Sequence, residues 1–317
     1  MNKNIEAKKR LELPFTGIAS FCKAPICTDR GQIQADIAIL GAPFDLAIQL
    51  RSGTRMGPRA IRDASTAFSI GGMGYYDPEL DLDLLEGIRI VDCGDVDIFH
   101  MDGQRSLQNI YEESKQIISQ DIFLVVLGGD HAVPIPLVRA YEEKGPIHLI
   151  QFDSHLDFVD ERAGIREGHN STIRRVLEMD HVFGITQIGM HGVSSSSKQV
   201  YEDARKAGNT VITLQDFRKI GIDGVIATLP DNSRFYVTVD IDALDLSIAP
   251  GTGLPSLGGM YYREIMETLR GIAAKGTVVG FDLCEVAPQY DPAGITAFTA
   301  AGIIVEFLGA IFSRRNR

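Results

Sequence analysis

The sequence predicts an α/β protein in which helices cover both faces of one mostly parallel sheet of about eight strands. Two observations predict this three-layer α/β/α fold. Eight short runs of apolar and β-branched residues recur along the chain. They are apolar throughout, which is typical of strands buried on both faces. Segments with helical periodicity lie between the runs, and alternating strands and helices favour a parallel sheet.

The expected elements follow one another along a single domain of residues 1–317, with about the first 30 residues as an extension or arm. No repeat, low-complexity tract or long linker marks a domain boundary. The strand runs cover residues 35–45, 88–97, 122–131, 147–155, 185–192, 210–216, 235–242 and 277–286. Apolar residues with a period near 3.6 predict helices over residues 103–119, 133–144, 198–208, 261–274 and 296–313.

The composition is that of a soluble globular protein and excludes several functional classes. The chain has 317 residues, of which 44% are hydrophobic and 23% charged, and a formal net charge of −11. This negative charge argues against nucleic acid as a partner and leaves room for a cationic substrate. The apolar runs are short and interrupted by glycine or charge, so we expect no membrane span. The N-terminus lacks the apolar stretch of a secretory signal, and we therefore expect a cytoplasmic protein.

The four cysteines show no CxxC pair and no zinc-finger spacing. Cys93 and Cys284 stand in apolar runs and should be buried free thiols. Cys22 and Cys27 lie near two prolines, and we expect them to be inert as well. The cysteines therefore point neither to a redox site nor to a thiolate metal site.

Acidic and imidazole side chains gather where four of the predicted strands end. The strand ends carry Asp130 and His131; Asp153, His155 and Asp157; Asp240, Asp242 and Asp245; and Asp282 and Glu285. In open α/β sheets, ligands bind at the carboxyl ends of the strands. The four strand ends therefore predict one common site.

A divalent metal is the natural counterion for such a site, because burying several carboxylates without compensation is costly. The alternative, a metal-free acidic edge, is disfavoured by that cost. Aspartates and histidines without cysteine suit Mn(II), Ni(II), Co(II) or Fe(II) better than a structural zinc. Six ligand residues exceed the needs of one ion, and Asp153 and Asp240 could each span two. A pair of ions holds a hydroxide nucleophile at neutral pH, so we expect metal-assisted hydrolysis.

The motifs GGDH, DSHLD, DIDALDLSIAPGTGLP and EVAPQYD resemble, in this order, the signature blocks of the ureohydrolase family of arginases and agmatinases. The segment RSGTRMGPRAIR at residues 51–62 resembles the family's N-terminal block. The resemblance runs from about residue 36 to 312 and is closer to the agmatinase-like branch than to arginase proper. It implies an arginase-like fold and the hydrolysis of a guanidino compound to urea and an amine.

The resemblance also implies the roles of individual residues. One ion would be held by His131, Asp153, Asp157 and Asp240, and the other by Asp153, His155, Asp240 and Asp242. Glu285 matches the residue that holds the substrate guanidinium, a planar cation that a carboxylate can bind through two parallel hydrogen bonds. His169 matches a histidine with a proton-transfer role. A hydroxide bridging the ions would attack the guanidinium carbon.

Three residues depart from the family pattern and concern the substrate, not the metal chemistry. Asn170 follows His169 where the family usually has glycine. Either Asn170 adopts the left-handed backbone conformation that glycine would take, or its side chain reshapes the pocket. Leu246 and Leu254 stand where proline and threonine are common, and these apolar side chains could narrow the rim of the site.

Several further residues invite simpler interpretations. Asp130 should either orient the neighbouring His131 or hold the loop, and we favour the first role because histidine ligands usually need a hydrogen-bond partner on the far nitrogen. The acidic segment YYDPELDLDLLEG should be a solvated connection. The histidines outside the motifs should be structural or exposed, and of these His191 deserves most interest because it ends a strand. These histidines are His100, His148, His181 and His191.

The sequence thus predicts a binuclear amidinohydrolase with two Mn(II) or Ni(II) ions per subunit, acting on agmatine or on a small or alkylated guanidine. Alternatives are a formimidoyl or amide hydrolase on the same scaffold, or a catalytic or regulatory subunit of a mixed oligomer acting on an atypical guanidine or biguanide. The resemblance implies a homo-trimer or homo-hexamer, with a homologous partner subunit as a further option.

Overall fold

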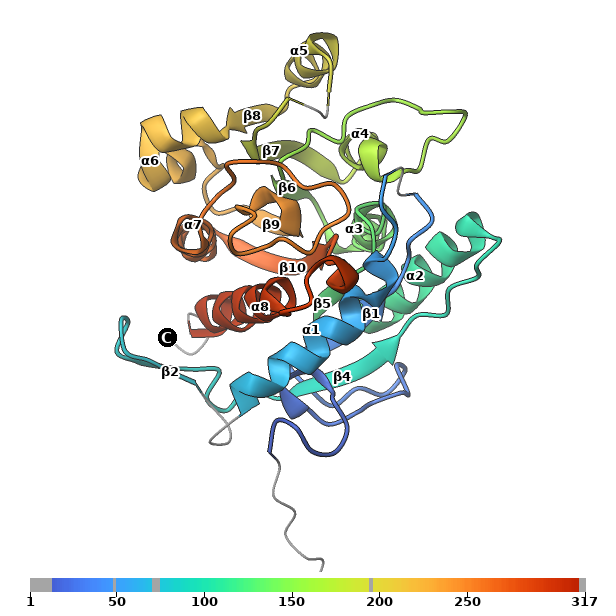
Figure 1. Ribbon diagram of the computed structural model, residues 1–317, viewed down its shortest axis with the longest axis vertical. Coiled ribbons are helices and arrows are strands. Elements are labelled where there is room, and N and C mark those ends of the chain that lie inside the picture. Colours follow the sequence, from blue (N-terminus) through green and yellow to red (C-terminus); the bar gives the residue numbers. More distant parts are fainter. Residues whose placement is uncertain (1–12, 48–49, 70–74, 194–195, 314–317) are drawn as a thin grey trace, which may run out of the picture.

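The computed structural model describes residues 13–47, 50–69, 75–193 and 196–313, and at its centre lies an eight-stranded sheet (Figure 1). All neighbouring strands in it are parallel. The strands are β1 (Ile37–Ala42), β4 (Ile90–Asp95), β5 (Phe123–Gly128), β6 (Ile147–Phe152), β7 (Val182–Met190), β8 (Thr210–Thr213), β9 (Arg234–Asp240) and β10 (Thr277–Cys284). Each of the eight apolar runs forms one of these strands, so the predicted sheet is confirmed.

The order of the strands determines which parts of the chain meet. Across the sheet the order is β4-β1-β5-β10-β9-β6-β7-β8. The last two strands in the sequence, β9 and β10, therefore lie between β5 and β6. Because all strands are parallel, the carboxyl ends of β5, β10, β9 and β6 lie side by side at one edge. This insertion brings the four acidic strand ends together.

Helices cover both faces of the sheet, which confirms the three-layer architecture. On one face lie α1 (Gly57–Ser65), α6 (Leu214–Thr228), α7 (Tyr262–Lys275) and α8 (Ile295–Ser313); on the other lie α2 (Gly103–Ile118), α3 (Pro134–Arg139), α4 (Thr172–Leu177) and α5 (Lys198–Lys206). Alternate residues of β1 serve the two cores. Ile37 and Ile39 pack into the first, and Ala38 and Leu40 pack into the second.

Four of the five predicted helices agree with the structure within two residues at each end, whereas the predicted helix 133–144 is shorter. It ends as α3 at Arg139, and a separate 3₁₀ turn covers Glu142–Lys144. Between them Tyr141 is buried against Tyr236 and donates a hydrogen bond to the Val279 carbonyl. Anchoring this side chain to the sheet interrupts the helical path. The helices α1, α4 and α6 were not predicted, since two are short and Gly221 interrupts the third with a positive φ.

The acidic segment predicted as a solvated connection forms a hairpin instead. Strands β2 (Tyr75–Asp77) and β3 (Leu82–Leu84) pair antiparallel and lie beside the sheet (Figure 1). Leu84 is buried in the core next to α8, and the Asp77 carboxylate accepts a hydrogen bond from Arg270 of α7. Most of the segment is exposed, as predicted, but the hairpin and its two buried leucines, Leu84 and Leu85, were missed because acidic residues dominate the composition.

Helix α8 is strongly apolar along its length. Its length and composition are those of a helix that could cross a membrane, in contrast to the expectation of short apolar runs. Most of this stretch is buried inside the molecule, where α8 packs between α1 and α7. A helix that is apolar on all sides is typical of such a buried position.

The chain before β1 is attached to the sheet where the structure describes it. Phe21 is buried, and its amide donates to the carboxylate of Asp92 on the edge strand β4. Asp92 also forms a bidentate ion pair with Arg62 of α1. A buried carboxylate needs such a partner, because an unpaired buried charge is strongly destabilising. Asp92 thus connects the N-terminal segment, the edge strand and α1.

We expect the buried His148 to make the folding stability depend on pH. Burial lowers the pKa of its imidazole to about 4, below the unfolded value of 6.5. Protonation therefore favours the unfolded chain, and stability is lost as the pH falls from 6.5 toward 4. We expect His148→Gln to remove this loss, so that wild type loses about 1–3 kcal/mol more than the variant between about pH 7.5 and pH 4.5. Urea unfolding at several pH values measures this, and equal losses would contradict it.

Candidate metal centre and active site

His131 lies at the centre of a group of carboxylates that come from two other strand ends. Its Nδ1 is 2.8 Å from Asp157 Oδ2, 3.0 Å from Asp153 Oδ2 and 3.6 Å from Asp240 Oδ2. His131 follows β5, Asp153 and Asp157 follow β6, and Asp240 ends β9. The ligand atoms of His131, Asp153 and Asp240 lie close enough together to hold one metal ion.

A second group shares Asp153 with the first. His155 Nδ1 lies 2.9 Å from Asp242 Oδ2 and 3.5 Å from Asp153 Oδ1. Ligand atoms of Asp153, His155 and Asp242 again lie close enough to hold an ion. Asp153 can therefore serve two ions, as expected from its place in the motif. Asp240 belongs only to the first group in this arrangement.

The predicted metal ligands thus form one cluster, which we call the Asp/His cluster. It consists of His131, Asp153, His155, Asp157, Asp240 and Asp242, and all six side chains are buried. Among the described residues, no lysine or arginine forms an ion pair with its aspartates. Four buried carboxylates beside two imidazoles form a hard, oxygen-rich donor set. Such a set fits divalent ions such as Mn(II) or Ni(II).

The pKa values reflect the strain of placing these groups together. Burial and the neighbouring charge of Asp153 raise the pKa of Asp157 to about 6. Burial, Asp242 and Asp153 raise the pKa of Asp240 well above its ordinary value. Burial acts against the charged forms of the two histidines, yet the carboxylates around them raise the pKa of His131 and of His155. The cluster attracts protons because it lacks positive charge, and a divalent cation would meet the same need.

Glu285 and His169 lie beside the cluster. The Glu285 carboxylate accepts a hydrogen bond from the amide of His131, at 2.9 Å, and lies 3.8 Å from His169 Nδ1. Although burial opposes protonation, Glu285 raises the pKa of His169 above its ordinary value. The structure therefore places both predicted catalytic residues next to the predicted metal ligands.

Two residues of the site hold an unfavourable backbone conformation. Asp157 and Glu285 have positive φ angles of 47° and 67°. A residue other than glycine in this conformation costs about 1–3 kcal/mol, and such strain often occurs at functional sites. Glu285 follows β10 directly, at a point where the chain turns, and the Glu285 amide donates a hydrogen bond to the Gly129 carbonyl. The strained turns direct both carboxylates toward His131.

The far nitrogen of His131 has a partner that the sequence analysis did not identify. Its Nε2 lies 2.9 Å from the hydroxyl of Thr238. Asp130, which we expected to orient this imidazole, instead accepts hydrogen bonds from the amides of Leu46, Ala47 and Ala132. The favoured role of Asp130 was therefore wrong, and the structure agrees with the other one: its side chain points toward the loop after β1 and holds that loop in place.

Other polar residues of the strands also support the cluster. Gln151 donates to Asp153 Oδ2 at 2.6 Å, and the Ser154 hydroxyl donates to Asp242 Oδ1 at 2.9 Å. Gln151 and Thr238 each stand two positions before a cluster aspartate on the same strand, and therefore on the same face. A polar residue at this spacing inside an apolar run was the signal that could have revealed them.

The backbone at Asn170 settles one alternative from the sequence. Asn170 lies in a 3₁₀ turn, His169–Ser171, and is not among the described residues with positive φ. The expectation of a left-handed conformation was therefore wrong. Its Oδ1 accepts a hydrogen bond from Ser171, while its buried Nδ2 has no partner among the described residues. Leu246 and Leu254 are both half-buried.

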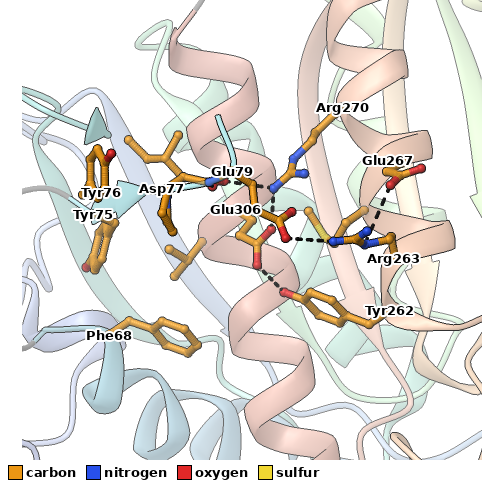
Figure 2. A pocket seen from close by; sticks show the side chains of 14 residues that line it. Phe68, Tyr75, Tyr76, Asp77, Glu79, Tyr262, Arg263, Glu267, Arg270 and Glu306 are labelled. Atoms are coloured by element: carbon orange, nitrogen blue, oxygen red, sulfur yellow. Dashed lines mark hydrogen bonds and ion pairs between the residues drawn. The ribbon is translucent and has the colours of Figure 1, made fainter. Parts of the chain in front are cut away.

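A separate pocket of about 370 Å³ lies between the hairpin β2–β3, α7 and α8 (Figure 2). It shares no residue with the Asp/His cluster. Arg270 bonds to Asp77 and Glu306, and Arg263 bonds to Glu79. Each of these carboxylates is bonded to an arginine, and among the described residues the pocket holds no group of acidic and imidazole side chains that could hold a metal.

Because the buried carboxylates of the Asp/His cluster repel one another, we expect metal-free protein to become more stable when one of them is neutralised. We expect Asp240→Asn to raise the melting temperature of metal-free protein by about 2 °C or more, because it removes repulsion between buried carboxylates. The same change should abolish the stabilisation that Mn(II) gives to wild type. Thermal unfolding with and without Mn(II) measures both effects.

Asp83→Asn is the matched control, since Asp83 is exposed on β3. It should change neither melting temperature. An Asp240→Asn protein that melts lower without metal, or that is still stabilised by Mn(II), would contradict a repulsive cluster that binds cations.

Known proteins resemble this chain over most of its length. The sequence pattern of the arginase family matches residues 35–309. The chain is 32% identical over 305 residues to the guanidinobutyrase of Pseudomonas aeruginosa, covering 94% of this chain and 93% of that protein. It is 31% identical over 301 residues to the mitochondrial guanidino acid hydrolase of Homo sapiens, covering 93% and 83%.

A solved structure shows the same architecture. The proclavaminate amidino hydrolase from Streptomyces clavuligerus superimposes with a TM-score of 0.85 and 28% sequence identity. The match covers 94% of this chain and 98% of that chain. The similarity therefore extends over nearly the whole molecule.

Proposed function

Because this chain belongs to the arginase family, hydrolases that cleave C–N bonds of linear amidines, we propose that it hydrolyses a guanidino compound to urea and an amine with two divalent metal ions. The observation that carries the proposal is the Asp/His cluster at the carboxyl ends of β5, β6 and β9, with two overlapping groups of ligand atoms. Glu285 beside it supplies a carboxylate for a cationic substrate.

Each ion would be held by four residues of the cluster, and two residues would be shared. One ion would be held by His131, Asp153, Asp157 and Asp240, and the other by Asp153, His155, Asp240 and Asp242. Mn(II) and Ni(II) both suit these donors, and the arginase family is Mn-dependent. When bound, a pair of such ions supplies a hydroxide nucleophile at neutral pH.

Glu285 and His169 have separate tasks in this proposal. The Glu285 carboxylate accepts N–H hydrogen bonds from the substrate guanidinium and so orients the carbon that is attacked. The hydrogen bond from the His131 amide fixes one oxygen of this carboxylate. His169, whose pKa is raised by Glu285, carries a proton that it can give to the departing amine nitrogen.

The substrate in this proposal is agmatine or another small aliphatic guanidine, including alkylated ones. The similar proteins named above act on guanidino acids by their names, so substrates with a carboxylate at the far end belong to the same class. Half-buried Leu246 and Leu254 present apolar side chains in the loop after β9, which suits an alkyl chain. Arginase-family enzymes are typically oligomeric, and we propose a homo-trimer or homo-hexamer.

Urea release by reconstituted protein tests the proposal. Metal-free protein would be loaded separately with Mn(II) and Ni(II) and given agmatine, arginine, guanidinobutyrate, guanidinopropionate, guanidine, methylated guanidines and a biguanide. We expect turnover of at least one guanidine, and none with Asp242→Ala. Glu285→Gln should lower kcat/KM about 10- to 100-fold, because it removes charged hydrogen bonds to the guanidinium.

Glu267→Gln serves as the control for Glu285→Gln, since Glu267 lines the separate pocket of Figure 2 and is largely exposed. It should leave kcat/KM unchanged. Protein that binds metal but releases urea from none of the compounds would contradict the proposed function.

A further inference from the structure

A chain of buried polar side chains leads from the Asp/His cluster into the sheet. The Nε2 of His131 lies 2.9 Å from the hydroxyl of Thr238 on β9, and this hydroxyl donates to Asp282 Oδ1 on β10 at 2.8 Å. All three residues are buried. Asp282 has no place in the Asp/His cluster and no role in the proposed chemistry.

The surroundings of Asp282 identify it as a hydrogen-bond acceptor. The Tyr236 hydroxyl donates to Oδ2 at 2.8 Å, and the Cys284 thiol donates to Oδ1 at 3.3 Å. Together with Thr238, three donors converge on one carboxyl group. An ionised carboxylate only accepts hydrogen bonds, so it satisfies all three neighbours at once.

Counting protons then fixes the role of Thr238. A threonine hydroxyl has a single proton, and Thr238 gives it to Asp282. Toward His131 the hydroxyl oxygen can therefore only accept, which requires a proton on Nε2. The other ring nitrogen, Nδ1, is the one that faces Asp153, Asp157 and Asp240.

We propose that Asp282 is a positioning residue for the metal site, which acts through Thr238 to hold the His131 ring with Nε2 protonated and Nδ1 directed at the cluster. The proposal rests on the proposed function, because it assigns Nδ1 as the atom that binds metal. Partners of metal-binding histidines fix the tautomer and orientation of the ring, and their loss typically weakens metal binding about 10- to 100-fold.

Metal affinity tests the proposal without reference to turnover. Binding of Mn(II) to metal-free protein would be measured by titration calorimetry for wild type, Thr238→Val, Thr238→Ser and Asp282→Asn. We expect Thr238→Val to bind about 10- to 100-fold more weakly. Thr238→Ser keeps the hydroxyl and should bind like wild type, and Asp282→Asn should weaken binding because it weakens the acceptor for Thr238.

The chain contains a matched control on the same sheet. The buried hydroxyl of Thr186 lies 2.9 Å from Nε2 of His148, the same contact at the same distance, but His148 is not part of the cluster. Thr186→Val should cost similar stability and leave Mn(II) affinity unchanged. Melting temperatures of the two valine variants show whether a loss of affinity merely follows a loss of stability.

The ring proton gives a second, independent measurement. In metal-free wild type labelled with ¹⁵N-histidine, we expect a His131 Nε2–H signal that exchanges slowly with water, assigned by its absence in His131→Asn. The signal should exchange rapidly or disappear in Thr238→Val and persist in Thr186→Val. Affinity within about threefold of wild type for Thr238→Val, or an unchanged ring signal, would overturn the proposal.

The outcomes also separate this proposal from the proposed function. If wild type binds no Mn(II) or Ni(II), the metal-dependent function fails, whatever the ring proton shows. If wild type binds metal and releases urea while Thr238→Val binds equally well, only the role of Asp282 and Thr238 is refuted.

Discussion

The structure depends on the electrostatic cost of burying four carboxylates beside one another. Asp153, Asp157, Asp240 and Asp242 lie away from water, and their neighbours His131 and His155 supply too little positive charge to neutralise them. An isolated buried charge is strongly unfavourable, so the arrangement is stable only with protons or cations. The raised pKa values of Asp157 and Asp240 express this demand. The same demand suits the site to divalent ions, whose positive charge would neutralise the carboxylates.

The strand order of the sheet brings these carboxylates together. Insertion of β9 and β10 between β5 and β6 aligns the carboxyl ends of four strands that are distant in the sequence. Strained turns at Asp157 and Glu285 then direct carboxylates toward His131. Beneath them Gln151 and Thr238 use hydrogen bonds from within the strands to hold individual ligand residues. The unfavourable contacts of the fold are therefore concentrated at the candidate metal site.

The sequence predicted the eight strands and the grouping of the six cluster residues, because apolar runs and motif order depend on local composition. The place of Thr238 two residues before Asp240 could have drawn attention to it, but its contacts with His131 and Asp282 join different strands and follow from the strand order, which local composition does not determine. Asp130 was assigned to His131 by adjacency, yet its side chain points to the loop at Leu46 and Ala47. The hairpin β2–β3 was missed because acidic residues conceal the buried Leu84.

We propose that the Asp/His cluster holds two metal ions that share Asp153 as a ligand. Electron paramagnetic resonance of protein reconstituted with increasing Mn(II) tests it most directly, because two ions bridged by one carboxylate couple magnetically. We expect a coupled-pair spectrum to grow as the second equivalent binds and to be absent from Asp153→Ala. A spectrum of isolated Mn(II) at full occupancy, or no bound Mn(II) at all, would refute a shared pair of ions.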